Sequence, residues 1–295
     1  MYSQIARNKR LSIIFVILFV VIIGGLGYLI AEAFGQPSYA YIILVASLSY
    51  AVISYFASAR IAIAMSGARE VQKSDAPELY RVVENLSIAS GLPMPKVYTI
   101  DDPAPNAFAT GRDPQHAIVA VTSGLLNIMD KPELEGVLAH ELSHVGNYDI
   151  RFMAVVVALV AVVSVISDLF LRLSFWSSFG DEDEGNNGNQ LFMILAIVGA
   201  ILAPLIALVV QLAVSRQREY LADSSGALLT RYPDGLASAL AKIGTYNKPM
   251  QKASSATAHL YISNPLKGRS LGGLFDTHPP IEERIKRLQA MDTKA

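Results

Sequence analysis

Four long apolar runs are the feature that most restricts how this chain can fold. They cover residues 11–30, 39–57, 152–171 and 191–214. Each run is long enough to cross the hydrocarbon core of a bilayer, which takes about 20 helical residues. Buried helices of a soluble core are the alternative, but four such lengths in one small chain favour membrane spans. The last two runs are the less clear pair, because they include Asp168, Pro204 and Gln211.

The amount of charge in the sequence supports the same class. Only 17% of the residues are charged, whereas a soluble domain has about 25%. The formal net charge of −1 excludes the strongly basic surface of a nucleic-acid-binding protein. The sequence has no cysteine, so disulfides are excluded and a metal ion would be bound through nitrogen and oxygen.

Basic residues predict the orientation of the apolar runs. The positive-inside rule places flanks rich in Lys and Arg on the cytoplasmic side. Basic residues precede the first run and follow the second and fourth, but none lies between the first and the second. We therefore expect residues 1–10, 58–151 and 215–295 to be cytoplasmic. A cleaved signal peptide ending near Ala33 is the alternative, but the first apolar run exceeds the length of about 7–15 residues that such peptides use.

The polar segments predict one mixed α+β domain. Helical spacing covers residues 75–90, and Gly91 supplies a C-terminal stop. Three short runs rich in β-formers follow, which we expect to form a small antiparallel sheet. These runs are residues 96–100, 106–110 and 117–122.

The helix expected after the sheet carries the most specific motif of the chain. It begins at a capping box made by Asp130 and Glu133, and it includes the sequence His140-Glu141-Leu142-Ser143-His144. Side chains four residues apart share one helical face, so His140 and His144 can bind one metal ion. A zinc ion in such a site lowers the pKa of bound water to about 7. Glu141 lies on a different face, where it can take the proton as hydroxide attacks a carbonyl.

A catalytic zinc site needs a third protein ligand. Glu219 and Asp223 are four residues apart just after the fourth apolar run, so one helical face offers a carboxylate ligand with a second carboxylate behind it. The second carboxylate can accept the other ring N–H of a ligating histidine. Taken alone, the stretch also fits a solvated helix beside the membrane. His116 and His259 are the other candidates for the third ligand.

A set of motifs in order gives the chain a family resemblance. The motifs are GLPMPKVYTIDDPAPNAFATG at 91–111, HELSHVGNYDIR at 140–151, REYLADSSGA at 218–227 and THPPIEERIKRL at 277–288. Together with the apolar runs they resemble the HtpX heat-shock membrane metalloproteases, relatives of the zinc-dependent CaaX prenyl protease. The resemblance implies an α-helical membrane protein with a cytoplasmic α+β domain of the glutamate-type zincin fold. It also implies one Zn²⁺ per chain, with Glu219 as the third ligand and Asp223 behind a ligand histidine.

The resemblance implies a function and a division of the chain. The function is zinc-dependent endoproteolysis of misfolded or damaged membrane proteins at the cell membrane, as part of quality control and the stress response. Four segments follow: a transmembrane hairpin (1–60), a first catalytic part (61–151), a second transmembrane or membrane-associated hairpin (152–214) and a second catalytic part (215–295).

Two further sites are expected around the metal. The family places the segment of His278 at the active site, and His278 with Arg284 could support the oxyanion. The alternative is a helix-capping histidine and a surface arginine. The run Asn106, Ala107, Phe108 and Ala109 is either an exposed sheet edge that pairs with a substrate strand or an ordinary core strand.

Two other classes of function remain as hypotheses. A transporter or channel component would need charged residues inside the membrane, and the apolar runs carry little charge beyond Asp168. A zinc-binding sensor or scaffold would have no use for Glu141. The sequence therefore favours a metalloprotease whose partners are the bilayer and membrane-protein or peptide substrates.

Overall fold

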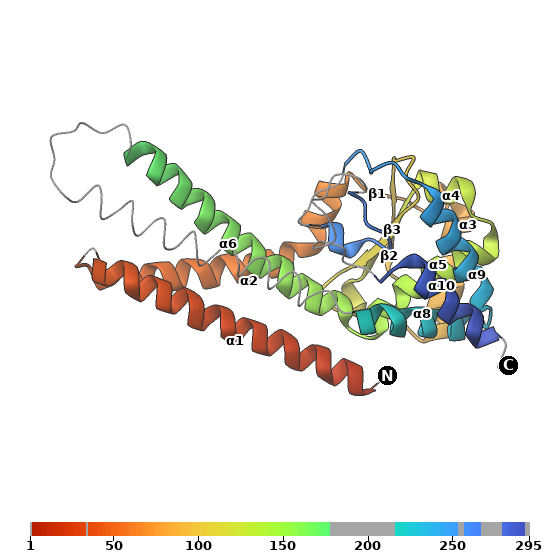
Figure 1. Cartoon of the computed structure of the whole chain (residues 1–295), viewed down its shortest axis with the longest axis horizontal. Coiled ribbons are helices and arrows are strands. Elements are labelled where there is room, and N and C mark those ends of the chain that lie inside the picture. Colours follow the sequence, from red (N-terminus) through yellow and green to blue (C-terminus); the bar gives the residue numbers. More distant parts are fainter. Residues whose placement is uncertain (1, 34, 178–215, 253–256, 267–278, 293–295) are drawn as a thin grey trace. The chain divides into compact units, whose positions relative to one another are not determined.

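The computed structural model describes residues 2–33, 35–177, 216–252, 257–266 and 279–292 (Figure 1). The chain divides into two compact units, each made from segments that are distant in the sequence. The sheet unit comprises residues 1–10, 57–154 and 213–295, and the helical unit comprises residues 11–56 and 155–212. Residues 1–10 thus belong with the polar domain, although in sequence they lead directly into the first apolar run.

Two helices account for the first two apolar runs. They are α1 (Tyr2–Ala33) and α2 (Ser38–Ser66). The stretches Ile5–Glu32 and Ser38–Ser66 are long and apolar enough to cross a membrane. Large apolar side chains remain exposed along both helices, as expected for surfaces that face lipid. The first two apolar runs therefore form two helices that are candidate membrane spans.

The third apolar run lies in α6 (Asp149–Ser177), which follows the motif helix α5 (Lys131–Gly146). The first half of α6 passes the test for a span only together with α5, and the two helices meet at a bend of 72°. The fourth run, residues 191–214, lies outside the described residues.

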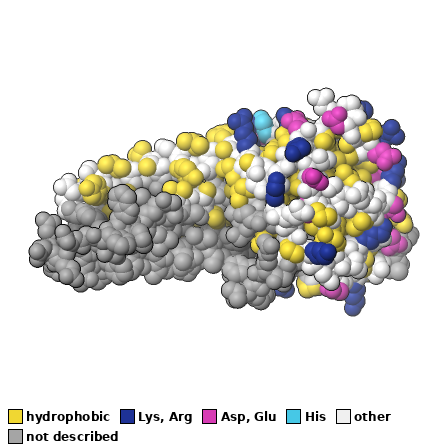
Figure 2. All heavy atoms as spheres, turned by 90° about the horizontal axis from the view of Figure 1, so that it is seen from above, with side chains coloured by type: hydrophobic (Ala, Val, Ile, Leu, Met, Phe, Trp, Pro, Cys, Tyr) yellow, Lys and Arg dark blue, Asp and Glu magenta, His cyan; other side chains and the backbone are white. Residues whose placement is uncertain are grey.

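Charged side chains are distributed unevenly over the surface. Figure 2 shows Lys, Arg, Asp and Glu gathered over the sheet unit, whereas the described helices in that view present hydrophobic side chains. This contrast is the one that a protein with a membrane part and an aqueous part requires.

The sheet has four strands in the order β1-β2-β4-β3. The strands are β1 (Arg69–Glu70), β2 (Lys96–Ile100), β3 (Ala107–Thr110) and β4 (Ile118–Thr122). β4 lies between β2 and β3, running parallel to β2 and antiparallel to β3. The prediction of an antiparallel sheet is therefore wrong for the central pair. β3 forms at the far edge and the chain then turns back, so β4 enters the sheet in the direction of β2.

Helices complete the sheet unit. Besides α5 they are α3 (Pro77–Ser90), the short turn η1 (Pro114–His116), α4 (Ser123–Ile128), α8 (Arg216–Thr230), α9 (Pro233–Thr245), η2 (Ala258–Leu260) and α10 (Ile281–Asp292). α5 packs against α3, α8, α9 and β3, so it runs through the middle of the unit. Gly91 ends α3 in the left-handed conformation at φ 68°, as predicted for this residue.

The capping box at the start of α5 is confirmed and has a tertiary role. The Asp130 carboxylate accepts the N–H of Glu133, and the Glu133 carboxylate accepts the N–H of Asp130. Buried Glu133 also accepts hydrogen bonds from Ser238 at 2.6 Å and Lys242 at 2.5 Å, both on α9. This one carboxylate therefore fixes both the beginning of α5 and its contact with α9.

We expect Glu133→Ala to destabilise the sheet unit. The change leaves three donors without their acceptor, at a cost of about 2 kcal/mol, and lowers the melting temperature by about 4–8 °C. Differential scanning fluorimetry on purified protein measures this shift. Glu135→Ala is the matched control, because Glu135 lies 3.8 Å from exposed Lys131 in a surface ion pair. Equal melting temperatures for the two variants would contradict the role of Glu133.

Candidate metal centre

The two histidines of the motif face each other on α5. Their Nε2 atoms are 3.2 Å apart. Each ring has its other nitrogen beside a carboxylate: His140 Nδ1 lies 2.9 Å from Asp223 Oδ1, and His144 Nδ1 lies 2.9 Å from Asp149 Oδ2. When Nδ1 donates its proton to the carboxylate, Nε2 keeps a lone pair directed at the other ring. Two such lone pairs at this distance repel each other unless a cation lies near both.

Glu219 supplies the third group from α8. Its carboxylate oxygens lie 3.6 Å from His144 Nε2 and 3.9 Å from His140 Nε2. Within the described parts of the chain, these three side chains form the one group whose ligand atoms converge well enough to hold a metal ion. Bonds of about 2.0–2.1 Å in a tetrahedron separate two ligands by roughly 3.3 Å, so the observed spacing fits an ion at the centre.

α8 can approach α5 this closely because of one glycine. A Cβ at Gly226 would lie 2.9 Å from the backbone N of His140 and 3.1 Å from the carbonyl carbon of Ala139. No larger residue fits without moving the helices apart. Since Glu219 lies two turns earlier on α8, the close crossing brings its carboxylate to the histidines.

The carboxylate behind His140 is itself held by a buried arginine. Arg284 on α10 has no exposed surface, and its Nε and Nη2 donate to Asp223 at 2.9 and 2.6 Å. Its Nη1 donates to the carbonyl of Ile262 at 3.1 Å. Burial opposes ionisation of Asp223, but Arg284 and His140 outweigh it and lower the pKa of Asp223 to about 2. The guanidinium of Arg284 is thus committed to Asp223.

The carboxylate behind His144 was not expected from the sequence. Asp149 begins α6, five residues after His144, and is almost fully buried. Burial opposes protonation of His144, but Asp149 and Glu219 outweigh it and raise its pKa to about 9. The surroundings of His144 therefore favour positive charge, whereas burial lowers the pKa of His140 to about 4. The position of Asp149, five residues after His144, is the signal in the sequence that could have identified it.

Glu141 follows His140 in the chain but is not one of the converging group. Its side chain is 1% exposed, and burial raises its pKa to about 7. The backbone N–H of Ala109 on β3 donates to the Glu141 carboxylate. A buried carboxylate that titrates near neutrality is suited to taking up and releasing a proton.

The edge position of β3 is observed, but the edge is not open. Asn106 and the four residues of β3 are buried. The carbonyl of Ala107 accepts the N–H of Ile262 at 2.9 Å, and Phe108 forms an antiparallel bridge with Tyr261. The Asn106 side chain also donates to the carbonyl of Ser263 at 2.8 Å. The hypothesis of an exposed edge over Asn106, Ala107, Phe108 and Ala109 therefore needs correction, because the chain's own segment pairs with it.

The remaining candidates lie elsewhere. His116 is exposed and pairs with Asp113 in η1, whereas His259 is buried in η2. Neither belongs to the converging group. His278 lies outside the described residues.

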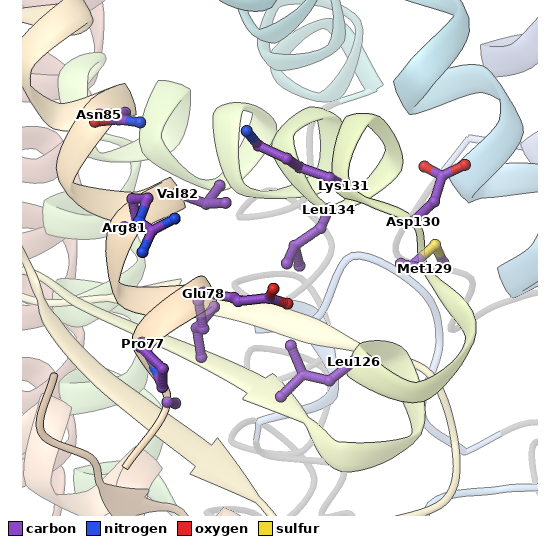
Figure 3. Close-up of a pocket in the computed structure, with 12 residues that line it drawn as sticks. Pro77, Glu78, Arg81, Val82, Asn85, Leu126, Met129, Asp130, Lys131 and Leu134 are labelled. Atoms are coloured by element: carbon purple, nitrogen blue, oxygen red, sulfur yellow. The ribbon is translucent and has the colours of Figure 1, made fainter. Parts of the chain in front are cut away.

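A cavity of about 360 Å³ borders the opposite end of α5. Figure 3 shows it between α3, α4 and the first turn of α5, with Leu126 and Leu134 directed into it. Its lining includes Glu78 and Lys131 but none of the metal-centre residues. The cavity is thus separate from the site of the histidines.

Comparisons with known proteins agree with this site. The family described as Peptidase family M48 matches residues 73–292, which include every residue of the metal centre. A "Protease HtpX homolog" of Tropheryma whipplei (strain Twist) is 53% identical over 292 residues, covering 99% of this chain and 98% of the relative. A "Protease HtpX homolog" of Lactobacillus helveticus (strain DPC 4571) is 48% identical over 302 residues, covering 99% of this chain and 100% of the relative.

The fold also has a solved counterpart. The crystal structure of Ste24p from S. mikatae matches 97% of this chain and 67% of its own chain, with a TM-score of 0.54 and 20% identity. This likeness is one of fold. On its sequence, its fold and its converging histidines and glutamate, the chain belongs to peptidase family M48, with the HtpX proteases, and is a membrane metallopeptidase.

Proposed function

We propose that this metallopeptidase is a zinc-dependent endopeptidase that cleaves cytoplasmic segments of misfolded or damaged membrane proteins. The observation that carries the proposal is the convergence of His140, His144 and Glu219 beside the buried carboxylate of Glu141. The first three offer a metal site and the fourth a proton acceptor, which together form the minimum for hydrolysing a peptide bond.

Zinc is the metal that this donor set favours. Two imidazole nitrogens and one carboxylate, with no thiolate in the chain, form a ligand set of catalytic zinc sites in hydrolases. Zinc would supply a Lewis acid that polarises the peptide carbonyl and lowers the pKa of water. The protein holds the two imidazoles in the required tautomer through Asp223 and Asp149.

Glu141 has the role of general base in this proposal. It would take a proton from the attacking water and later return it to the amine of the leaving peptide. Its burial supports this role, since a carboxylate with a pKa of about 7 can both accept and donate a proton at neutral pH.

Support for the oxyanion is assigned to His278 rather than to Arg284. The role of His278 is the one that the family resemblance implies. Both Nε and Nη2 of Arg284 already donate to Asp223, so we assign Arg284 to holding that carboxylate. A substrate strand could pair with β3 only after the segment of Tyr261 and Ile262 leaves the edge.

The orientation is proposed from charge and connectivity. Residues 1–10 and 57–154 belong to one unit, so α1 and α2 must either both cross the membrane or both remain on one side. Their length and apolar surface favour crossing. Basic residues lie near the beginning of α1 and near the end of α2, so we place the sheet unit in the cytoplasm.

Short tethers favour cleavage near the membrane. Seven residues separate His144 from the third apolar run, and four separate Glu219 from the fourth. At about 1.5 Å per helical residue, these tethers are about 10 Å and about 7 Å long. Enzyme and substrate anchored in the same bilayer also meet at a raised effective concentration. A cytoplasmic segment close to a transmembrane helix is therefore the preferred substrate in this proposal.

The test is a set of model substrates with one cleavable sequence. The sequence is placed at increasing distances from a single transmembrane anchor, on the cytoplasmic or the opposite side, and also in a soluble protein. We expect cleavage only on the cytoplasmic side, fastest near the anchor and slower as the spacer lengthens. Equal rates at all spacings and in the soluble protein would show that membrane proximity plays no part.

A further inference from the structure

The segment before the first apolar run reaches the metal centre. Asn8 is 2% exposed and belongs to the sheet unit. Its Nδ2 donates to the backbone carbonyl of Asn147 at 2.9 Å and to Asp149 Oδ1 at 2.6 Å. The neighbouring ammonium of Lys9 lies 4.6 Å from the centre of the Tyr148 ring. Three consecutive residues of the α5–α6 turn are thus contacted by two consecutive residues of the N-terminal segment.

The same turn holds one of the metal ligands in place. Tyr148 has φ 61°, a left-handed conformation that favours glycine. A turn of this kind persists only where its surroundings hold it. Because Asp149 follows directly, the turn decides where the Asp149 carboxylate lies relative to His144.

The two oxygens of Asp149 have separate tasks. Oδ2 lies 2.9 Å from His144 Nδ1, and Oδ1 accepts the hydrogen bond from Asn8 Nδ2. Arg218 is a weaker neighbour, with Nε 3.8 Å from Oδ1. If Asn8 is removed, Oδ1 loses its short hydrogen bond and the carboxylate is free to turn. His144 then loses the fixed partner that orients its ring.

We propose that Asn8 is a positioning residue of the metal centre, acting on His144 through Asp149. Through Asn8, the segment before the first apolar run therefore supports the metal centre. The inference rests on metal binding by His140, His144 and Glu219, but not on the substrate or the orientation proposed above.

The experiment measures metal binding by full-length protein purified in detergent. Zinc affinity is obtained by competition with a chromophoric chelator, and the visible spectrum of Co²⁺-loaded protein reports the ligand geometry. We expect Asn8→Ala to weaken zinc binding by about 10-fold and to alter the Co²⁺ spectrum. Arg7→Ala is the matched control, since Arg7 contacts exposed Gln217 instead of Asp149. That variant should match the wild type in both measurements.

Two additional variants separate positioning from a general loss of stability. Asn8→Asp keeps the size of the side chain but replaces the donor with a charge beside Asp149, so it should weaken zinc binding at least as much as Asn8→Ala. If Asn8→Ala does not fold, Asn8→Asp tests the proposal in its place. In the double variant with Asp149→Ala, the effect of Asn8→Ala should disappear, because Asn8 then has no carboxylate to hold.

The outcomes are distinct. Unchanged zinc affinity and an unchanged Co²⁺ spectrum in Asn8→Asp would overturn the proposal. Independent, additive losses from Asn8→Ala and Asp149→Ala would also overturn it. A wild-type protein that bound no stoichiometric metal would instead overturn the metal centre itself.

Discussion

Replacing Glu141 with glutamine is expected to abolish proteolysis while the metal stays bound. The amide has nearly the shape of the carboxylate, so the buried side chain can be accommodated, but it cannot take up a proton. Loss of a general base reduces the rate by about 100-fold to 10,000-fold. Because Glu141 is not among the converging ligand atoms, the variant should keep the ligand set.

The measurement combines a cleavage assay with the metal content of the same preparation. Glu135→Gln is the matched control, since Glu135 lies on the same helix in a surface ion pair with Lys131. It should retain activity and metal. A Glu141→Gln protein that had lost its metal would mean that Glu141 is a ligand, and one that retained full activity would mean that another group takes the proton.

Replacing Glu219 with glutamine is expected to remove both the metal and the activity. The neutral amide oxygen is a much weaker ligand than the carboxylate, and the change removes negative charge 3.9 Å from the buried guanidinium of Arg284. Partners of metal ligands change affinity by about 10-fold to 100-fold, so loss of a ligand itself should exceed about 100-fold.

Chelator competition measures this loss, and excess zinc should restore part of the activity. Glu282→Gln on α10 is the control, because Glu282 is exposed and does not belong to the converging group. Zinc affinity in Glu219→Gln equal to that of the control would contradict Glu219 as a ligand.

The parts that were predicted correctly depend on local sequence. The capping box of Asp130 and Glu133 and the C-terminal glycine of α3 act within one helical turn, so the sequence determines them directly. The shared face of His140 and His144 follows from helical spacing alone. Likewise, the two leading helices and their candidacy as membrane spans follow from run length and hydropathy.

The parts that were missed depend on contacts between distant segments. Asn8 and Asp149 are 141 residues apart, and Arg284 and Asp223 are 61 apart, so no local pattern pairs them. The antiparallel sheet was mispredicted for the same reason, since spacing along the chain does not say that β4 lies beside β2 and parallel to it. Pairing of the β3 edge with Tyr261 requires the chain to return after more than 150 residues.

X-ray absorption at the zinc edge tests the central claim most directly. On wild-type protein loaded with one zinc per chain, we predict scattering from two imidazole nitrogens at about 2.0–2.1 Å together with carboxylate oxygen. The Asn8 and Glu141 variants should retain this ligand set, whereas Glu219→Gln should lose it. A spectrum with three imidazoles, as His116 or His259 would give, or with no imidazole at all, would contradict the assignment of His140, His144 and Glu219 as the metal site.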